Sequence, residues 1–277
     1  MISSIQVDKY NRDGYILIDN VLSADEIRML RSEVKYEARA IGERVVLEKG
    51  SNIVRSIYGV HFSNRLFDAA ARQGRIVEPV KKILKNDVYV YQSKVNLKGA
   101  FDGDVWDWHQ DYIYWHKEDG MPASKVLTVA VFLDEVTEFN GPLMLIPGSH
   151  RHGVLSSRVL DTHPAGYENK PGWIANLTAD LKYTIDRNVI SELVQANGIV
   201  SAKGSAGSVL IFDGNIVHAS PANISPLART LLLYTYNRVD NAPDIGKLHR
   251  PDFLVSRDSR PIQVLDDSIR EQLQRSA

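Results

Sequence analysis

Short runs of β-branched and aromatic residues begin near residue 88 and recur along the rest of the chain, and they restrict the fold more than any other feature. Runs of this composition, bounded by glycine, proline and asparagine, are typical of β-strands. Many short strands in one chain favour a β-sandwich or a jelly roll with helices packed outside it. The predicted strands cover residues 88–96, 126–133, 141–148, 209–212 and 231–236.

The first third of the chain has a mainly helical pattern. Ser23 and Glu26 match a capping box, and apolar residues follow at helical spacing, which predicts a helix over residues 25–42. Further predicted elements are a strand at 15–18, a hairpin within 45–58, a helical zone at 64–85 and a partly helical segment at 175–197.

No repeat, low-complexity tract or linker divides the 277 residues, so we expect one domain spanning 1–277. Within it we expect a helical layer over about 1–86, a jelly-roll core over about 87–240 and a C-terminal extension over about 241–277. The predicted fold class is mainly β with flanking helices.

The charge balance excludes several classes of partner. The 33 basic and 34 acidic residues give a net charge of −1, without the basic excess that favours nucleic acid or an anionic membrane. There is no cysteine, which excludes disulfides and thiolate metal sites. The N-terminus lacks an apolar signal core, and the apolar strand at 126–133 is far shorter than the roughly 20 residues that span a bilayer. We expect a cytoplasmic monomer or homodimer that acts on a small molecule.

A candidate metal site begins with His109 and Asp111, two residues apart. On a strand such residues point to the same face, so an imidazole and a carboxylate would project together. A pair of this kind alone is most often solvated, and a third ligand is needed. His218 follows a predicted strand, a turn and the apolar residues Ile216 and Val217. The six other histidines lie in polar or turn-like segments. The alternative for His218 is a histidine buried in the core without a metal. A 2-His-1-carboxylate set leaves positions on Fe(II) open for substrate and oxygen.

Arg229 precedes a long apolar strand, where an unpaired cation would be costly to bury. Guanidinium geometry matches a carboxylate through two parallel hydrogen bonds. Fe(II) oxygenases with a facial triad commonly use 2-oxoglutarate, whose distal carboxylate needs a cation. Ser220, two residues after His218, could add a hydroxyl to this clamp; the alternative for Arg229 is a salt bridge within the protein.

These residues lie within a longer resemblance to the phytanoyl-CoA-dioxygenase-like family of Fe(II)/2-oxoglutarate oxygenases, and within it to bacterial free L-proline trans-4-hydroxylases. Ectoine hydroxylases share the core around Trp108, His109 and Asp111 and the motif at 115–122, so these motifs specify the family better than the substrate. The similar stretches are residues 87–96, 103–114, 118–121, 140–143, 146–150, 212–220 and 236–241.

The resemblance implies a double-stranded β-helix core and the cofactors Fe(II), 2-oxoglutarate and O2. It places iron at His109, Asp111 and His218, and the distal carboxylate of 2-oxoglutarate at Arg229. The carboxylate at position 111 also implies hydroxylation, since related halogenases carry a small residue there. Further cosubstrate contacts implied by motif position are Gln92, Asn96, Thr128 and Ser220.

A free amino-acid substrate would need a cation for its carboxylate, an anion for its amine and an aromatic wall. For Arg55 and Arg238 a structural salt bridge is an equal alternative. The candidates are Arg55, Arg238 and Lys94 for the carboxylate, Asp107 or Glu118 for the amine, and Tyr91, Tyr112 and Trp115 for the wall.

The leading hypothesis is hydroxylation of L-proline to trans-4-hydroxy-L-proline, with release of succinate and CO2. One alternative keeps the chemistry but uses ectoine, pipecolate or another small amino-acid-like compound. A second alternative is a non-catalytic jelly-roll protein that binds metal. It is disfavoured because structural zinc usually has four protein ligands, and only three candidates converge here.

Overall fold

The computed structural model of the chain describes residues 2–40, 42–155, 157–160, 172–266 and 269. The α-helices of this part are α1 (Ser4–Asp13), α2 (Ala24–Glu37), α3 (Val60–Ser63), α4 (Arg65–Ala71), α5 (Gly74–Leu84), α6 (Asp111–Asp119) and α7 (Arg187–Asn197). Short 3-10 helices occur at η1 (Ser149–His152), η2 (Gly172–Leu177), η3 (Val239–Asn241) and η4 (Ile245–Lys247).

Most of the strands are short, as the sequence predicts, and two are longer, with 11 residues in β4 and 10 in β13. They are β1 (Tyr15–Ile18), β2 (Val45–Leu47), β3 (Val54–Tyr58), β4 (Val88–Lys98), β5 (Trp106–His109), β6 (Val126–Phe132), β7 (Leu143–Leu145), β8 (Ser157–Val159), β9 (Tyr183–Ile185), β10 (Val200–Ala202), β11 (Val209–Asp213), β12 (His218–Ser220) and β13 (Arg229–Arg238).

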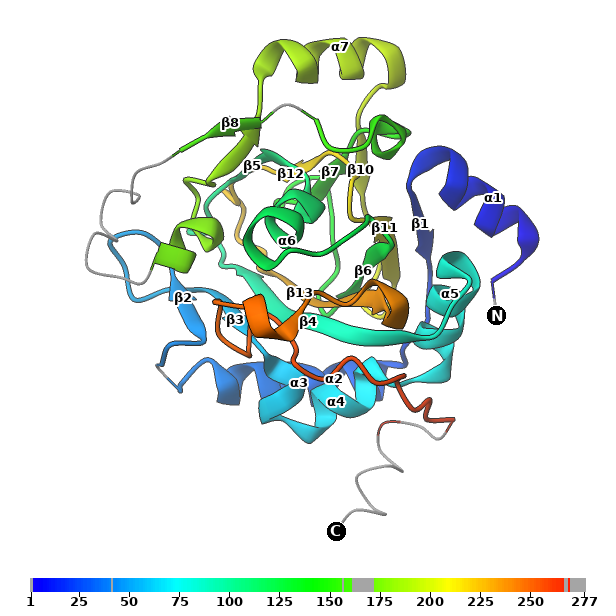
Figure 1. Cartoon of the computed structure of the whole chain (residues 1–277). Coiled ribbons are helices and arrows are strands. Elements are labelled where there is room, and N and C mark those ends of the chain that lie inside the picture. The colour runs from blue at the N-terminus through cyan, green and yellow to red at the C-terminus, as the bar shows by residue number, and fades with distance from the viewer. Residues whose placement is uncertain (1, 41, 156, 161–171, 267–268, 270–277) are drawn as a thin grey trace.

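Two antiparallel sheets form the core of the molecule. The larger sheet has seven strands in the order β1-β11-β6-β13-β4-β3-β2, and the smaller has four in the order β10-β7-β12-β5. Figure 1 shows the smaller sheet lying over the larger one, while β8 and β9 form a separate pair. The predicted jelly-roll fold is confirmed.

The larger sheet is buried on both faces. On β6, Val129 and Val131 pack into the outer core with the helices, whereas Ala130 and Phe132 pack between the sheets. This two-sided burial explains why β6 reads as a continuous apolar run and not as an alternating one. Each large side chain so buried contributes about 1.5–3 kcal/mol to folding.

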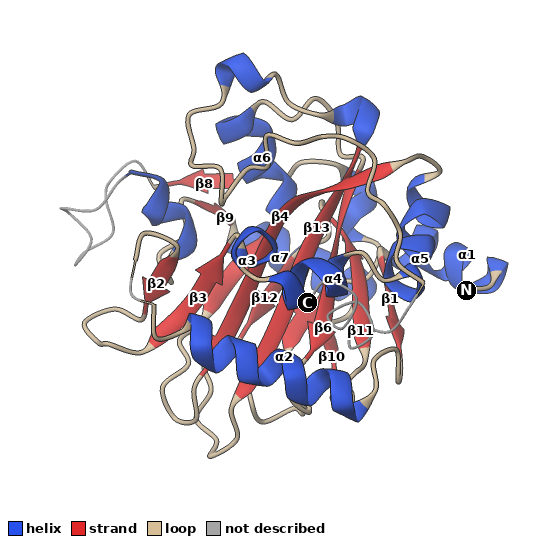
Figure 2. Ribbon diagram, turned by 90° about the horizontal axis from the view of Figure 1, so that it is seen from below, coloured by secondary structure: helices blue, strands red, loops and turns tan. Residues whose placement is uncertain are grey.

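Helices α2, α4 and α5 cover the outer face of the larger sheet (Figure 2). The capping box that begins α2 is present, with Ser23 Oγ accepting from Glu26 N at 3.4 Å and Ser23 N donating to Glu26 Oε2 at 2.9 Å. Helix α2 ends at Glu37, short of the predicted residue 42. The chain turns back there, and Arg44 donates to the Glu37 carboxylate at 3.1 Å.

The region expected to be a helical layer also supplies strands. β1 forms one edge of the larger sheet, and β2 and β3 form the other. Residues from 267 onward in the expected C-terminal extension lie outside the described part of the chain, apart from 269. None of the helices in the described part is both long and apolar enough to cross a membrane.

Candidate metal centre and cosubstrate pocket

The three predicted metal ligands meet between the two sheets. His109 ends β5, His218 begins β12, and these two residues face each other across the antiparallel pair. Asp111 lies beside them, with its oxygens 3.7 Å from His109 Nε2 and 3.9 Å from His218 Nε2. One ligand atom from each residue lies within 4.8 Å of the others, and all three residues are buried. The structure therefore brings the predicted triad together.

Asp111 reaches this position from a helix and not from a strand, which corrects the strand geometry assumed from the sequence. β5 ends at His109, and Asp111 is the first residue of α6. Gln110 fixes the junction, because its Nε2 donates to Gly153 O at 2.8 Å and to Asn215 O at 2.6 Å. The turn brings the carboxylate toward both imidazoles.

The donor set suits a divalent metal ion. His109 Nδ1 lies 2.6 Å from Asp107 O, and His218 Nδ1 lies 3.1 Å from Ile216 O, so each Nε2 is directed toward Asp111. Burial lowers the pKa of His109 to about 3 and also lowers the pKa of His218. Burial raises the pKa of Asp111, but Lys94 and the two imidazoles outweigh this and hold it below its ordinary value. Two neutral imidazoles and a carboxylate are ligands in the protonation states that metal binding requires.

The inner face of β4 carries a row of polar side chains. Gln92, Lys94, Asn96 and Lys98 alternate along the strand, so they share one face. Their partners on β13 include Leu231 and Leu233, which pack between the sheets, so this face is the inner one.

Arg229 lies at the end of this row and has no ion pair with any carboxylate of the described residues. Its Nε and Nη2 both donate to Gly141 O, at 3.1 and 2.9 Å. Burial, followed by the neighbouring cation Arg55, lowers the pKa of Arg229 to about 9. Within the described part of the chain, Ser220 Oγ and Asn96 Oδ1 are also buried without a hydrogen-bond partner. The buried Arg229 cation and the Ser220 hydroxyl, which can donate, fit a bound anion, whereas Asn96 Oδ1 can only accept.

The other two predicted cosubstrate contacts have partners within the protein. Gln92 Nε2 donates to Leu254 O at 2.8 Å, and Thr128 Oγ1 lies 3.2 Å from Thr235 Oγ1. Both residues are buried, and Gln92 also lines the cavity described next.

A small cavity of about 30 Å³ adjoins the triad. Its wall contains two of the metal ligands together with aromatic, apolar and cationic side chains. The lining residues are Tyr58, Gln92, Lys94, Trp106, His109, Asp111, Tyr114, Trp115, Leu177, Leu181 and Arg250. Of the predicted substrate residues, Trp115 and Lys94 are among them.

Neither predicted arginine lines this cavity. Arg55 is buried nearby, where its Nη1 donates to Glu48 at 3.0 Å and its guanidinium stacks 3.8 Å from the Trp106 ring. Arg238 lies at the opposite end of β13 from Arg229, about 30 Å away at a rise of about 3.4 Å per residue. It pairs with Asp240 through Nε at 2.8 Å.

Two predicted aromatic residues do not line the cavity. Tyr91 donates to Asp119 and packs edge-on against Trp115, with ring centroids 5.7 Å apart. Tyr112 stacks on His116 at 5.5 Å.

The two candidates for the substrate amine are engaged elsewhere. Asp107 Oδ1 accepts from Trp108 N at 2.7 Å. Glu118 accepts from Lys182 Nζ at 2.6 Å and from the Tyr183 hydroxyl at 2.7 Å.

Sequence reasoning missed Arg250, a buried cation in the wall of the cavity. Its Nε donates to Asp119 Oδ1 at 2.7 Å, and its Nη2 also bonds this carboxylate. Tyr58 was missed as well, and its buried hydroxyl has no partner among the described residues. Side chains alternate between the two faces of β3, and this alternation could have indicated the face on which Tyr58 lies. No sequence pattern around Arg250 indicated that it lines the cavity.

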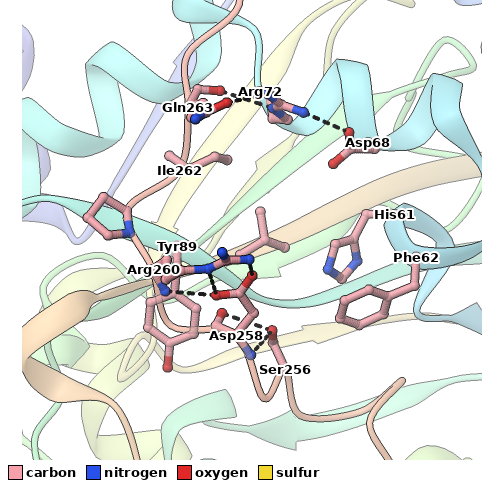
Figure 3. Close-up of a pocket in the computed structure, with 12 residues that line it drawn as sticks. His61, Phe62, Asp68, Arg72, Tyr89, Ser256, Asp258, Arg260, Ile262 and Gln263 are labelled. Atoms are coloured by element: carbon pink, nitrogen blue, oxygen red, sulfur yellow. Dashed lines mark hydrogen bonds and ion pairs between the residues drawn. The ribbon is translucent and has the colours of Figure 1, made fainter.

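A second pocket, of about 390 Å³, lies between α3, α4, β4 and the segment 256–263 (Figure 3). Its charged side chains pair with one another: Arg260 binds Asp258 through two hydrogen bonds of 2.8 and 2.6 Å, and Arg72 binds Asp68 at 3.1 Å. His61, at its rim, lies 2.5 Å from Ser93 Oγ through Nδ1. We call this the outer pocket.

Comparison with known proteins identifies the family. The family model for phytanoyl-CoA dioxygenase matches residues 10–231. L-proline trans-4-hydroxylase of Streptomyces griseoviridis is 39% identical over 258 residues, which cover 93% of this chain and 94% of the relative. Ectoine dioxygenase of Stutzerimonas stutzeri (strain A1501) is 38% identical over 271 residues, covering 95% of this chain and 87% of the relative.

Solved structures agree with this assignment. The crystal structure of EctD from S. alaskensis with bound Fe has a TM-score of 0.80 and 32% identity, and covers 97% of this chain and 89% of its own. The structure of EctD with 2-oxoglutarate and 5-hydroxyectoine has a TM-score of 0.81 at the same identity and coverage. The chain belongs to the phytanoyl-CoA dioxygenase family and is a dioxygenase, which confirms the resemblance seen in the sequence.

Proposed function

We propose that this protein is an Fe(II)- and 2-oxoglutarate-dependent hydroxylase that converts L-proline to trans-4-hydroxy-L-proline, with release of succinate and CO2. The observation that carries the proposal is the buried triad of His109, Asp111 and His218, together with a buried arginine of the same core that lacks a carboxylate partner in the described part of the chain. The choice of L-proline is supported by the relative of that activity, which matches this chain along almost its whole length.

His109 and His218 would hold iron through Nε2, and Asp111 through its carboxylate. When bound, iron together with 2-oxoglutarate and O2 supplies the oxidising power that inserts one oxygen atom into a C–H bond. The hydrogen bonds from each Nδ1 to a backbone carbonyl keep the rings oriented, and burial keeps them neutral. Because the site is buried, it would also exclude water from the reaction.

Arg229 would bind the distal carboxylate of 2-oxoglutarate, with Ser220 Oγ as a further donor. Both lie on the inner side of the core, and neither has a side-chain partner among the described residues that would compete for this role. Asn96 would provide a polar contact on β4. Gln92 and Thr128 would act at the edge of the cosubstrate site, since both already have partners within the protein.

The cation for the substrate carboxylate would come from Arg250 or Lys94, which both line the cavity. No hydrogen bond or ion pair of the Lys94 amine is found with the described residues, whereas Arg250 is held in place by Asp119. Trp115, Trp106 and Tyr114 would form the aromatic wall. The cavity is small, at about 30 Å³, and we propose that its lining side chains move when substrate enters.

Ectoine is the second candidate substrate, because ectoine dioxygenases match this chain with nearly the same identity and an EctD structure shares its fold. Both compounds are small, cyclic and carry a carboxylate. The predicted cytoplasmic location also belongs to this proposal and is consistent with the absence of cysteine.

The test is a panel of L-proline, D-proline, pipecolate and ectoine, with Fe(II), 2-oxoglutarate and O2. We expect L-proline to give a product heavier by one oxygen atom and one equivalent of succinate per product. Background turnover with L-proline but full coupling with ectoine would overturn the substrate assignment and leave the reaction class intact. No consumption of 2-oxoglutarate, with or without these compounds, would overturn both.

A further inference from the structure

Tyr58, the last residue of β3, has a buried hydroxyl that the proposed function does not use. The residue is only 1% exposed, and it lines the cavity at the triad. Its hydroxyl has no hydrogen-bond partner among the described residues. A buried hydroxyl without a partner is unfavourable in the free protein, so a ligand that bonds it gains affinity.

Strand pairing places Tyr58 beside a cation. Tyr58 and Lys94 lie directly opposite each other in the antiparallel pair of β3 and β4. Opposite residues of such a pair point to the same face, with Cβ atoms about 4.5–5.5 Å apart. Both residues line the cavity. A hydroxyl beside a cation suits the head of an α-amino acid, because its amine and its carboxylate are attached to the same carbon atom.

The wall of the cavity has no free carboxylate for a substrate amine. Asp111 is the only carboxylate among the lining residues of the described part of the chain, and it belongs to the triad. Two cations, Lys94 and Arg250, are available for the substrate carboxylate. The amine would therefore bond a neutral acceptor.

The Tyr58 hydroxyl suits this role better than the other neutral groups of the wall. The two indoles that line the cavity can only donate. The Tyr114 hydroxyl is engaged by the Tyr183 backbone, since it donates to O and accepts from N, both at 3.1 Å. Gln92 is fixed through its bond to Leu254 O at 2.8 Å. The Tyr58 hydroxyl can accept a hydrogen bond without losing an existing one.

We propose that Tyr58 determines substrate specificity: its hydroxyl accepts a hydrogen bond from the ring N–H of a cyclic amino acid, while a cation of the cavity binds the carboxylate of the same molecule. The inference rests on the proposed function and adds the group that selects the amine. Tyr58 contacts neither iron nor the cosubstrate in this role. A substrate analogue without the N–H is therefore disfavoured only when the Tyr58 hydroxyl is present.

The test is a thermodynamic cycle between the Tyr58 hydroxyl and the substrate N–H. L-proline is compared with (S)-tetrahydrofuran-2-carboxylate, which carries a ring oxygen in place of the N–H. Each compound is titrated under nitrogen into protein loaded with Fe(II) and 2-oxoglutarate, and calorimetry gives its Kd. Wild-type protein should bind L-proline at least about tenfold more tightly, because a site built for an N–H rejects an analogue that lacks it.

Tyr58→Phe removes only the hydroxyl. The Kd for L-proline should rise by about tenfold or more, the size expected for one hydrogen bond to a charged group. The Kd for the oxygen analogue should stay within about twofold of its wild-type value, since that compound has no N–H to lose a partner. The Kd for 2-oxoglutarate should not change.

Tyr234→Phe is the matched control. Tyr234 is also a buried tyrosine, but its hydroxyl donates to Phe67 O at 2.7 Å in the outer core. This variant should leave all three affinities unchanged. Thermal unfolding of metal-free protein separates the two variants further: Tyr234→Phe should lower the Tm, whereas Tyr58→Phe should not, because its hydroxyl makes no bond within the described protein.

An unchanged Kd for L-proline in Tyr58→Phe, or an equal rise for both compounds, would overturn the specificity role. Weaker binding of 2-oxoglutarate would also overturn it, since the hydroxyl would then contact the cosubstrate. If Tyr58→Phe does not fold, the two affinities of the wild type decide, and equal values would overturn the role. A wild-type protein that binds 2-oxoglutarate but no L-proline would instead overturn the substrate assignment, and the inference with it.

Discussion

The cavity at the triad and the outer pocket differ most in how their polar groups are satisfied. The outer pocket has a volume of about 390 Å³, yet Arg260 and Arg72 are each bound to a carboxylate (Figure 3). The cavity at the triad has only about 30 Å³, but its wall includes the Tyr58 hydroxyl and the Lys94 amine, which have no hydrogen-bond partner among the described residues. On the inner face of the same core, Arg229 has only a backbone acceptor.

This difference shows that volume is a poor guide to function in this molecule. A pocket whose charges are paired internally gains little by binding an ion, because each new contact replaces an existing one. Buried groups without partners are costly in the free protein, so a ligand that satisfies them binds with a large gain. The following predictions compare matched substitutions in the two regions.

The largest effect is expected at the metal ligand. Asp111→Ala should reduce succinate formation by more than about 100-fold. Removing a residue that only hydrogen-bonds to a metal ligand costs up to about 100-fold, and removing the ligand itself should cost more. Asp258→Ala, in the outer pocket, should leave turnover within about twofold because it only pairs with Arg260. Turnover of Asp111→Ala near the wild-type rate would refute its assignment as a ligand.

The next largest effect is expected from an arginine without a carboxylate partner, Arg229, compared with a paired arginine, Arg260. Arg229→Met should weaken 2-oxoglutarate binding by about 100-fold, or about 3 kcal/mol, the size expected for loss of a buried charge pair. Arg260→Met should leave that affinity unchanged, since its charge is paired at the surface. Anaerobic calorimetry measures both constants, and equal affinities in the two variants would contradict the proposed clamp.

A smaller and more selective effect is expected at Arg250. Arg250→Met should raise the KM for L-proline by about tenfold or more, through loss of a charge-assisted bond worth about 1.5–3 kcal/mol. The affinity for 2-oxoglutarate should not change. Arg72→Met is the control in the outer pocket and should leave the KM for L-proline unchanged. An unchanged KM in Arg250→Met, or an equal rise in Arg72→Met, would contradict the assignment.

The sequence predicted much of this site for clear physical reasons. His109 ends one strand and His218 begins another, and antiparallel pairing of these strands places them side by side. The role of Arg229 as a clamp stays a prediction, which rests on the cost of burying a cation without an anion. The alternation of Gln92, Lys94, Asn96 and Lys98 also indicates one polar face of a strand that is otherwise apolar.

Other parts of the site depend on tertiary folding and were not predictable in this way. Arg250 enters the cavity because the chain beyond η3 returns to β4, where Gln92 binds Leu254 O. Arg238 is also an arginine, but it lies at the end of β13 opposite to Arg229, and only the register of the sheet shows this position. Helix α6 was missed because its aromatic residues pack on several sides and show no amphipathic period.

The smallest predicted effect is on stability and concerns the outer pocket. Burial lowers the pKa of His61 from 6.5 to about 4, so the unfolded chain binds more protons between these pH values. The stability that neutral His61 contributes is complete above about pH 6.5 and is lost as the pH falls toward 4. In urea unfolding of metal-free protein, His61→Gln should reduce the difference in unfolding free energy between pH 8 and pH 4.5 by about 1–2 kcal/mol. An unchanged difference would show that His61 does not contribute to acid sensitivity.

The central claim is that His109, Asp111, His218 and Arg229 together bind Fe(II) and 2-oxoglutarate. The most direct measurement is the visible absorption of the protein with both added under nitrogen. We predict a weak charge-transfer band that requires both components, changes when L-proline is added and is absent in Asp111→Ala. No band in the wild type, or an equal band in Asp111→Ala, would contradict the claim.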